Sequence, residues 1–188
     1  MDITIFVNLT SRAWGLPILS KLHAGVPGRQ APLLAATGAG RSAFAQSVEH
    51  LIILGLLERN PGHGHPLRPE FRLTPKGVVA AEIAGRIYDV VKTADLDLLR
   101  RSWTLPVLTA LQAPRHFTGI KRSLHTISDR ALSQSLKAME ARNWVQRSID
   151  GAARPPRPLY RSVNTGGLIS EVTAPSIRLA QGSNGVQV

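Results

Sequence analysis

Hydrophobic positions in the second half of the chain switch between helical and strand-like spacing. An apolar stripe at i, i+4 and i+7 predicts an amphipathic helix from Asp129 to about Arg142. The stripe consists of Leu132, Leu136 and Met139. Ser128 precedes this helix as a good N-cap. A shorter amphipathic helix is predicted over residues 115–124, and a tight turn at residues 125–127 joins the two helices.

Two later segments alternate like strands, one over residues 144–149 and one over residues 159–163. The proline-rich stretch between them carries Arg154 and Arg157 and cannot pair internally, so it predicts the tip of a hairpin. A further helix is predicted over about residues 103–112. Three short helices followed by a two-stranded hairpin with a basic tip are the outline of a winged helix-turn-helix.

The first half of the chain repeats this pattern. Six of the eleven residues at 12–22 are identical to those at 101–111, and further matches follow in the same order at offsets of 88 and 89. The repeat predicts a mainly α fold with small β content, made of two tandem winged helix-turn-helix domains. The first domain, residues 1–92, has a degenerate DNA-reading face and ends in a linking helix. The second, residues 93–188, is more basic and ends in a tail rich in Gly, Ser and Asn.

Within the first domain the opening helix is predicted from Leu16 to about His23. Apolar residues at helical spacing over residues 78–99 predict one helix that is broken near residues 93–95, where Asp95 is expected to cap the next helix.

Composition excludes several classes of function. The chain has 188 residues, 43% of them apolar, and no cysteine, which excludes disulfides, zinc fingers and iron–sulfur clusters. No apolar stretch approaches the ~20 residues of a membrane span, so we expect a cytoplasmic protein without a membrane partner. His63 and His65 lie two residues apart without acidic neighbours, so we expect no metal and no other cofactor. Because no nucleophile–base constellation emerges, we do not expect an enzyme.

The charge indicates a polyanionic partner. The net charge is +11, from 23 basic and 12 acidic residues. The first 92 residues contribute +4 and the remainder contributes +7; between Arg115 and Arg157 there are nine basic residues and three acidic ones. This concentration favours a surface that docks on double-stranded DNA.

The predicted helix from Asp129 has an outward face suited to bases. With Leu132 facing inward, helical geometry places Arg130, Gln134 and Lys137 on the opposite side and Ser133 at its flank. Arg can bind guanine bidentately, Gln can bind adenine, and Lys suits a phosphate. Any solvated helix face can carry such residues, so the position after a helix and a turn, and before a basic hairpin, is what favours DNA.

Residues 101–167 resemble the HxlR family of bacterial winged-helix transcriptional regulators, within the MarR-like group. The resemblance is carried by Trp103, Val107-Leu108 and Leu111, Arg115-His-Phe117, Ile120 and Leu124, Ile127-Ser128, Leu132-Ser-Gln134-Ser-Leu136, Met139-Glu140, Val145, Arg147, Tyr160, Thr165 and Gly166. It implies a sequence-specific DNA-binding regulator, more often a repressor, whose helix enters the major groove and whose wing reaches the minor groove. The counterparts here are Arg130 and Gln134 for bases. Those for backbone or minor groove are Arg115, Lys121, Arg154 and Arg157, and Ser128 and Ser133 complete the expected DNA-binding set.

Family members bind as dimers of two chains, whereas two units in one chain form a pseudo-dimer; whether two chains also associate stays open. The first unit is the weaker copy, because Glu49 occupies the place of Lys137 and would face phosphate. Either the first unit reads another half-site with its own polar residues, or it has drifted toward packing, dimerisation or ligand binding. Its candidate DNA-binding residues are Arg41, Ser42, Gln46 and Arg68.

Trp14 and Trp103 have two interpretations. They are core residues, as Trp144 is expected to be, or they line a cleft between the units in which a flat aromatic effector stacks. The second interpretation belongs to a repressor that a small apolar or aromatic effector relieves. An alternative function is a small-molecule-binding winged-helix protein that has lost most DNA recognition.

Overall fold

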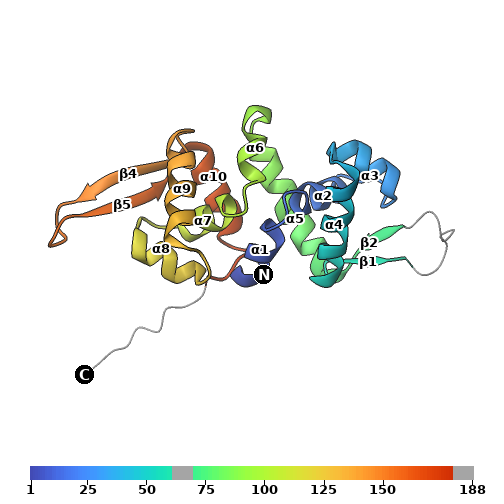
Figure 1. Ribbon diagram of the computed structural model, residues 1–188, viewed down its shortest axis with the longest axis horizontal. Coiled ribbons are helices and arrows are strands. Elements are labelled where there is room, and N and C mark those ends of the chain that lie inside the picture. The colour runs from blue at the N-terminus through green and yellow to red at the C-terminus, as the bar shows by residue number, and fades with distance from the viewer. Residues whose placement is uncertain (61–69, 180–188) are drawn as a thin grey trace, which may run out of the picture. The chain divides into compact units, whose positions relative to one another are not determined.

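The computed structural model describes residues 1–60 and 70–179. They are mainly helical and form two small antiparallel sheets, which confirms the coarse fold class expected from the sequence (Figure 1). Contacts divide the chain into two units. The first unit runs from Asn8 to Ser102, and the second unit combines Met1–Val7 with the residues from Trp103 on. This division places the boundary after Ser102, whereas the sequence placed it after residue 92.

The first unit begins within helix α1 (Ile3–Thr10), at Asn8. Its elements are α2 (Gly15–His23), α3 (Gln30–Thr37), α4 (Arg41–Ile53), β1 (Leu57–Arg59), β2 (Phe71–Leu73), α5 (Pro75–Val90), a short 3-10 helix (Thr93–Asp95) and α6 (Leu96–Leu99). Helix α2 packs against α5, and Ile18, Leu19 and Ile87 are fully buried in the resulting core. Burial of such side chains is the main favourable term in folding this unit.

The region after the first hairpin is broken as predicted. Helix α5 ends at Val90, and the 3-10 turn precedes α6. The predicted cap was wrong: Asp95 is the residue before α6, but its side chain makes no capping hydrogen bond to that helix. The 3-10 turn runs directly into α6 and places Asp95 at φ −109° and ψ 1°, away from the extended conformation usual for an N-cap.

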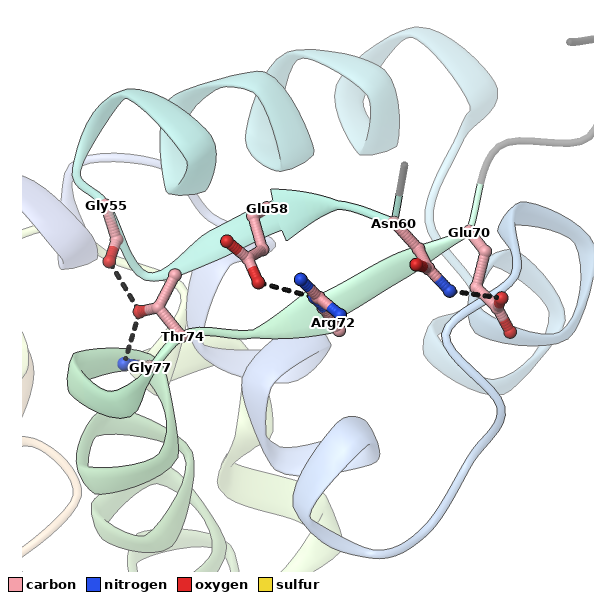
Figure 2. A network of polar contacts seen from close by, with 7 residues as sticks. All are labelled: Gly55, Glu58, Asn60, Glu70, Arg72, Thr74 and Gly77. Atoms are coloured by element: carbon pink, nitrogen blue, oxygen red, sulfur yellow. Dashed lines mark hydrogen bonds and ion pairs between the residues drawn. The ribbon is translucent and has the colours of Figure 1, made fainter. Parts of the chain in front are cut away.

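The turn from β2 into α5 is fixed by Thr74 (Figure 2). Its hydroxyl donates to Gly55 O at 2.6 Å and accepts from the backbone N–H of Gly77 at 3.0 Å. A Cβ on Gly77 would lie 1.8 Å from Leu56 O, so only glycine fits where α5 crosses the end of the α4–β1 turn.

A cluster of larger side chains packs near the end of the first unit. The guanidinium of Arg100 lies 5.1 Å from the centre of the Trp14 ring, a cation–π contact. Burial raises the pKa of Tyr88 to about 12, against the opposing influence of Arg100. Trp14 itself is half-buried within its own unit.

The second unit contains a similar order of elements. They are α7 (Thr104–Ala110), β3 (Arg115–His116), α8 (Phe117–Leu124), α9 (Asp129–Glu140), β4 (Val145–Asp150), β5 (Arg157–Ser162) and α10 (Asn164–Thr173). The sheet order is β3-β5-β4, and all neighbours are antiparallel. The β4–β5 hairpin projects beyond α8 and α9 (Figure 1).

Strand β3 corrects the sequence-based expectation. The helix predicted from Arg115 begins only at Phe117, because Arg115 pairs with Tyr160 and His116 pairs with Leu159 in the sheet. The hairpin predicted as two-stranded is therefore part of a three-stranded sheet. A two-residue strand has no hydrophobic period of its own, so only its pairing partner reveals it.

The core of the second unit includes Trp144, which is 2% exposed, as predicted. A Cβ on Gly166 would lie 2.1 Å from Trp144 O, so α10 approaches this backbone as closely as glycine allows. Trp103 is half-buried.

The first residues of the chain complete this unit. The Met1 ammonium donates to Ser176 O at 2.6 Å, and Ile3 N–H donates to Arg178 O at 3.0 Å. The N-terminal segment thus lies against the segment that follows α10, although the two are far apart in sequence.

Candidate nucleic-acid interface

Helices α8 and α9 form a helix-turn-helix within the second unit. The turn bends at His125, whose φ is +53°, and buries Ile127. Ser128 then caps α9 as predicted, accepting from the backbone N–H of Ala131 at 3.2 Å. The predicted stripe is buried, so the opposite face of α9 is turned to solvent.

The solvent face of α9 presents the predicted base-reading side chains. Arg130, Gln134 and Lys137 are exposed, and Ser133 is half-buried at their flank. Among residues 1–60 and 70–179, no acidic side chain lies within ion-pair distance of Arg130 or Lys137. Their charges are therefore available to a phosphate or a base edge.

The hairpin adds exposed cations beside this helix. Arg154 lies in the loop between the strands and Arg157 begins β5, and both are exposed. Two strand arginines that the sequence-based site omitted, Arg147 and Arg161, are exposed as well. Arg161 donates to the neutral amide oxygen of Gln146, so its charge is not cancelled. The polar positions in the alternating strand pattern carried the signal that would have found them.

Two predicted backbone contacts have partners inside the protein. Arg115 is half-buried, and its Nη1 donates to the Ser123 hydroxyl at 3.1 Å, so it ties β3 to α8. Lys121 lies 2.6 Å from a carboxylate oxygen of Asp129, which begins α9. This exposed ion pair is weak, so Lys121 can exchange it for a phosphate at little cost.

The corresponding surface of the first unit is partly neutralised. Arg41, Ser42 and Gln46 are exposed on α4. Glu49, however, lies on the same solvent side and pairs with Arg59 of β1 at 2.9 Å. Across the hairpin, Arg72 pairs with Glu58 (Figure 2).

Some predicted features lie outside what the structure describes. Arg68, His63 and His65 fall between residues 60 and 70. Within the described segments no group of three or more His, Cys, Asp or Glu side chains is placed to hold a metal ion. Trp14 and Trp103 belong to different units, each described by itself, and their shared cleft stays a prediction.

Comparison with known protein families gives a match that lies mostly in the second unit. Residues 98–180 match the family described as HxlR-like helix-turn-helix, which suggests a DNA-binding transcription regulator. The match begins within α6, near the end of the first unit, and covers most of the second unit. No curated protein and no solved structure matches the chain. No helix in the described residues is long and apolar enough to cross a membrane.

Proposed function

We propose that this protein is a sequence-specific transcriptional repressor that reads operator DNA with the second unit. Helix α9 enters the major groove, Arg130 and Gln134 contact bases, and the β4–β5 hairpin reaches the adjacent minor groove. The observation that carries the proposal is the exposed face of α9, whose Arg130 and Lys137 have no acidic partner among the described residues, in the segment that matches the family.

The charge distribution gives this binding an expected signature. Lys137 and the hairpin arginines neutralise phosphates and release counterions, so affinity falls steeply between about 50 mM and about 200 mM salt. Arg130 and Gln134 supply base contacts and should add sequence preference with less salt dependence.

The test begins with selection of bound sequences from a random DNA pool, followed by binding measurements on the selected site and on scrambled DNA. R130A should lose about 1–3 kcal/mol on the selected site and relax the preference at one base position. K137A should weaken binding to both DNAs alike and reduce the salt slope by about 1.

The matched control is R86A, which removes an exposed arginine from α5 of the first unit. It changes the net charge of the chain as R130A does but leaves α9 intact. Equal losses for R130A and R86A on the selected site, or equal losses for R130A on both DNAs, would refute the assignment of Arg130 to a base.

We also propose that both units are winged helix-turn-helix domains of one duplicated sequence, forming a pseudo-dimer in one chain. Two observations support this: the order of elements is similar, and Gly77 and Gly166 each meet the backbone carbonyl of the residue just before the first hairpin strand of their unit. Sedimentation of the protein on one DNA site tests it. One chain per full site is expected, and two chains would favour a homodimer instead.

A second candidate function is small-molecule binding by the first unit. A cavity of about 450 Å³ lies between α4 and its hairpin, with Phe44, Val48 and Phe71 among its lining and the Glu49–Arg59 pair at its edge. An apolar or aromatic effector that enters it, or that stacks on Trp14 or Trp103, would relieve repression. Quenching of tryptophan fluorescence by hydrophobic ligands, measured alongside DNA titration, separates this candidate from a protein that only binds DNA.

A further inference from the structure

His116 joins the three strands of the second sheet at the base of the hairpin tip. Its Nδ1 lies 2.9 Å from the backbone oxygen of Pro158 on β5, and its Nε2 lies 3.2 Å from Oδ2 of Asp150 on β4. Asp150 ends β4, and its other carboxylate oxygen accepts from the backbone N–H of Ala152 at 3.0 Å. One imidazole therefore contacts both strands directly before the loop that carries Arg154.

The backbone of His116 has a second task. It is the N-cap residue of α8, so the helix-turn-helix begins at the residue whose side chain holds the hairpin. The side chain gives no hydrogen bond to the helix end, and it is committed to the sheet. His116 therefore links the hairpin to the start of α8.

The chemistry of the two contacts selects one form of the ring. A backbone carbonyl and a carboxylate are both acceptors, so each ring nitrogen must donate. Neutral imidazole carries a single N–H, whereas imidazolium carries two. With neutral His116, one of the two contacts would set a lone pair against an acceptor.

The charged neighbours are few. The register places Asp150 on β4 and Arg157 and Arg161 on β5 on the same face of the sheet as His116. Arg115, the preceding residue of β3, points to the opposite face and bonds Ser123 on α8. Asp150 is the acidic partner of His116 in the described residues.

We propose that His116 is a positioning residue that, as imidazolium, locks the hairpin to the helix-turn-helix so that the tip arginines meet DNA together with α9. The part concerning DNA rests on the proposed function; the lock itself does not.

The test uses the full chain and three substitutions at the lock. H116Q offers one amide that cannot donate to both acceptors as imidazolium does. H116R keeps several donors and a permanent charge, and D150N removes the carboxylate while keeping its shape. The control is H125Q, which removes a histidine of the same unit from the turn before α9.

Amide hydrogen exchange of the hairpin tip, corrected for intrinsic rates, reads the lock without DNA. In the wild type and in H125Q, protection at Ala152, compared at one pH, should be about fivefold greater than in H116Q and D150N, as the loss of one hydrogen bond implies. H116R should keep this protection, because it retains several donors and a positive charge. Protection at Ala152 that is the same in H116Q, D150N and H125Q would overturn the proposal.

Footprinting on the selected DNA reads the consequence. H116Q should bind about fivefold more weakly and lose protection of the flanking minor groove, while the major-groove protection from α9 stays. A merely structural role would weaken both footprints together. If wild-type protein binds no selected DNA, the proposed function fails and hydrogen exchange still decides the lock. If it binds DNA but neither hydrogen exchange nor footprinting changes when His116 is substituted, only the proposed lock fails.

Discussion

Helices α4 and α9 hold the same place in the order of elements of their units, yet their solvent faces differ in charge. Helix α9 presents Arg130 and Lys137 without an acidic partner in the described residues. Helix α4 presents Glu49, whose carboxylate forms an ion pair with Arg59 of the adjacent strand. A similar succession of helices and strands thus presents an open cationic face in one unit and, apart from Arg41 at the start of α4, a paired face in the other.

The hairpins differ in the same direction. Within β1 and β2, Glu58 and Arg72 stand directly opposite each other in the register and pair (Figure 2). Within β4 and β5, Arg161 stands opposite Gln146, a neutral residue, whereas Arg157 stands opposite Asp150, whose carboxylate contacts His116. Cross-strand partners of opposite charge cancel the field that a phosphate would meet, whereas a neutral partner leaves it. The lesson is that the partner of each cation decides how much of the net charge can serve binding.

The largest expected effect is the destabilisation of one unit at a time by an alanine substitution at its closely packed glycine. G166A should destabilise the second unit by about 3 kcal/mol or more, because the new Cβ meets the backbone oxygen of Trp144. G77A should do the same to the first unit through Leu56 O. Hydrogen exchange read by peptides from each unit locates the damage, and DNA binding should be lost in G166A and largely retained in G77A.

The controls are G119A in the second unit and G40A in the first. A Cβ at Gly119 makes an ordinary 3.8 Å contact and one at Gly40 meets nothing within 4 Å, so neither should cost stability through a clash. DNA binding that disappears in G77A but survives in G166A would reverse the comparison between the units.

The next largest effect comes from reversing one charge on each of the helices α9 and α4. K137E should cost about 2 kcal/mol or more of DNA affinity at low salt, because it replaces a phosphate partner by a carboxylate. E49K should raise affinity for any DNA sequence about tenfold and steepen the salt slope, since it adds a cation and releases Arg59.

Binding isotherms across salt concentrations measure both variants. E49Q is the intermediate control, since it removes the carboxylate without adding a cation. If E49K leaves affinity unchanged, the α4 face does not approach DNA, and the first unit has drifted to another task.

A smaller effect concerns the caps of the two helices. Ser128 caps α9, so S128A should lower the stability of the second unit by about 1 kcal/mol. Helix α4 starts after Gly40, which has extended backbone angles and offers no side-chain cap. G40S should stabilise the first unit by a few tenths of a kcal/mol, about 0.3. Denaturant midpoints followed in each unit check the pair, and a loss of stability in G40S would contradict it.

The smallest effect lies at the start of the chain. The backbone N–H of Thr4 donates to Asp2 at 2.7 Å and holds the pKa of that carboxyl below its ordinary value. A lowered pKa stabilises the fold at neutral pH, and this contribution is lost as pH falls below about 4. D2A should therefore lower stability slightly at pH 7, because solvent screens this exposed carboxylate, and should converge with the wild type in acid. Thermal unfolding as a function of pH measures the convergence.

The local sequence pattern alone was enough to predict much of the secondary structure of the second unit. The stripe of α9, its Ser128 cap and the alternation of β4 and β5 are encoded within a few residues of one another, so each was predictable from periodicity and capping chemistry. The exposed positions of Arg130, Gln134 and Lys137 follow from the same stripe, because a buried face fixes the opposite one.

The tertiary structure decided which groups each side chain meets. Strand β3 exists because β5 lies beside it, Arg115 turns inward to Ser123, and His116 reaches two other strands. The attachment of Met1–Val7 to the second unit joins residues from opposite ends of the chain. Hydrophobic spacing records which face of an element is buried, but it carries no information on which distant element covers that face. The sequence therefore determined how much charge the protein carries, and only the tertiary structure decided which of those charges are paired.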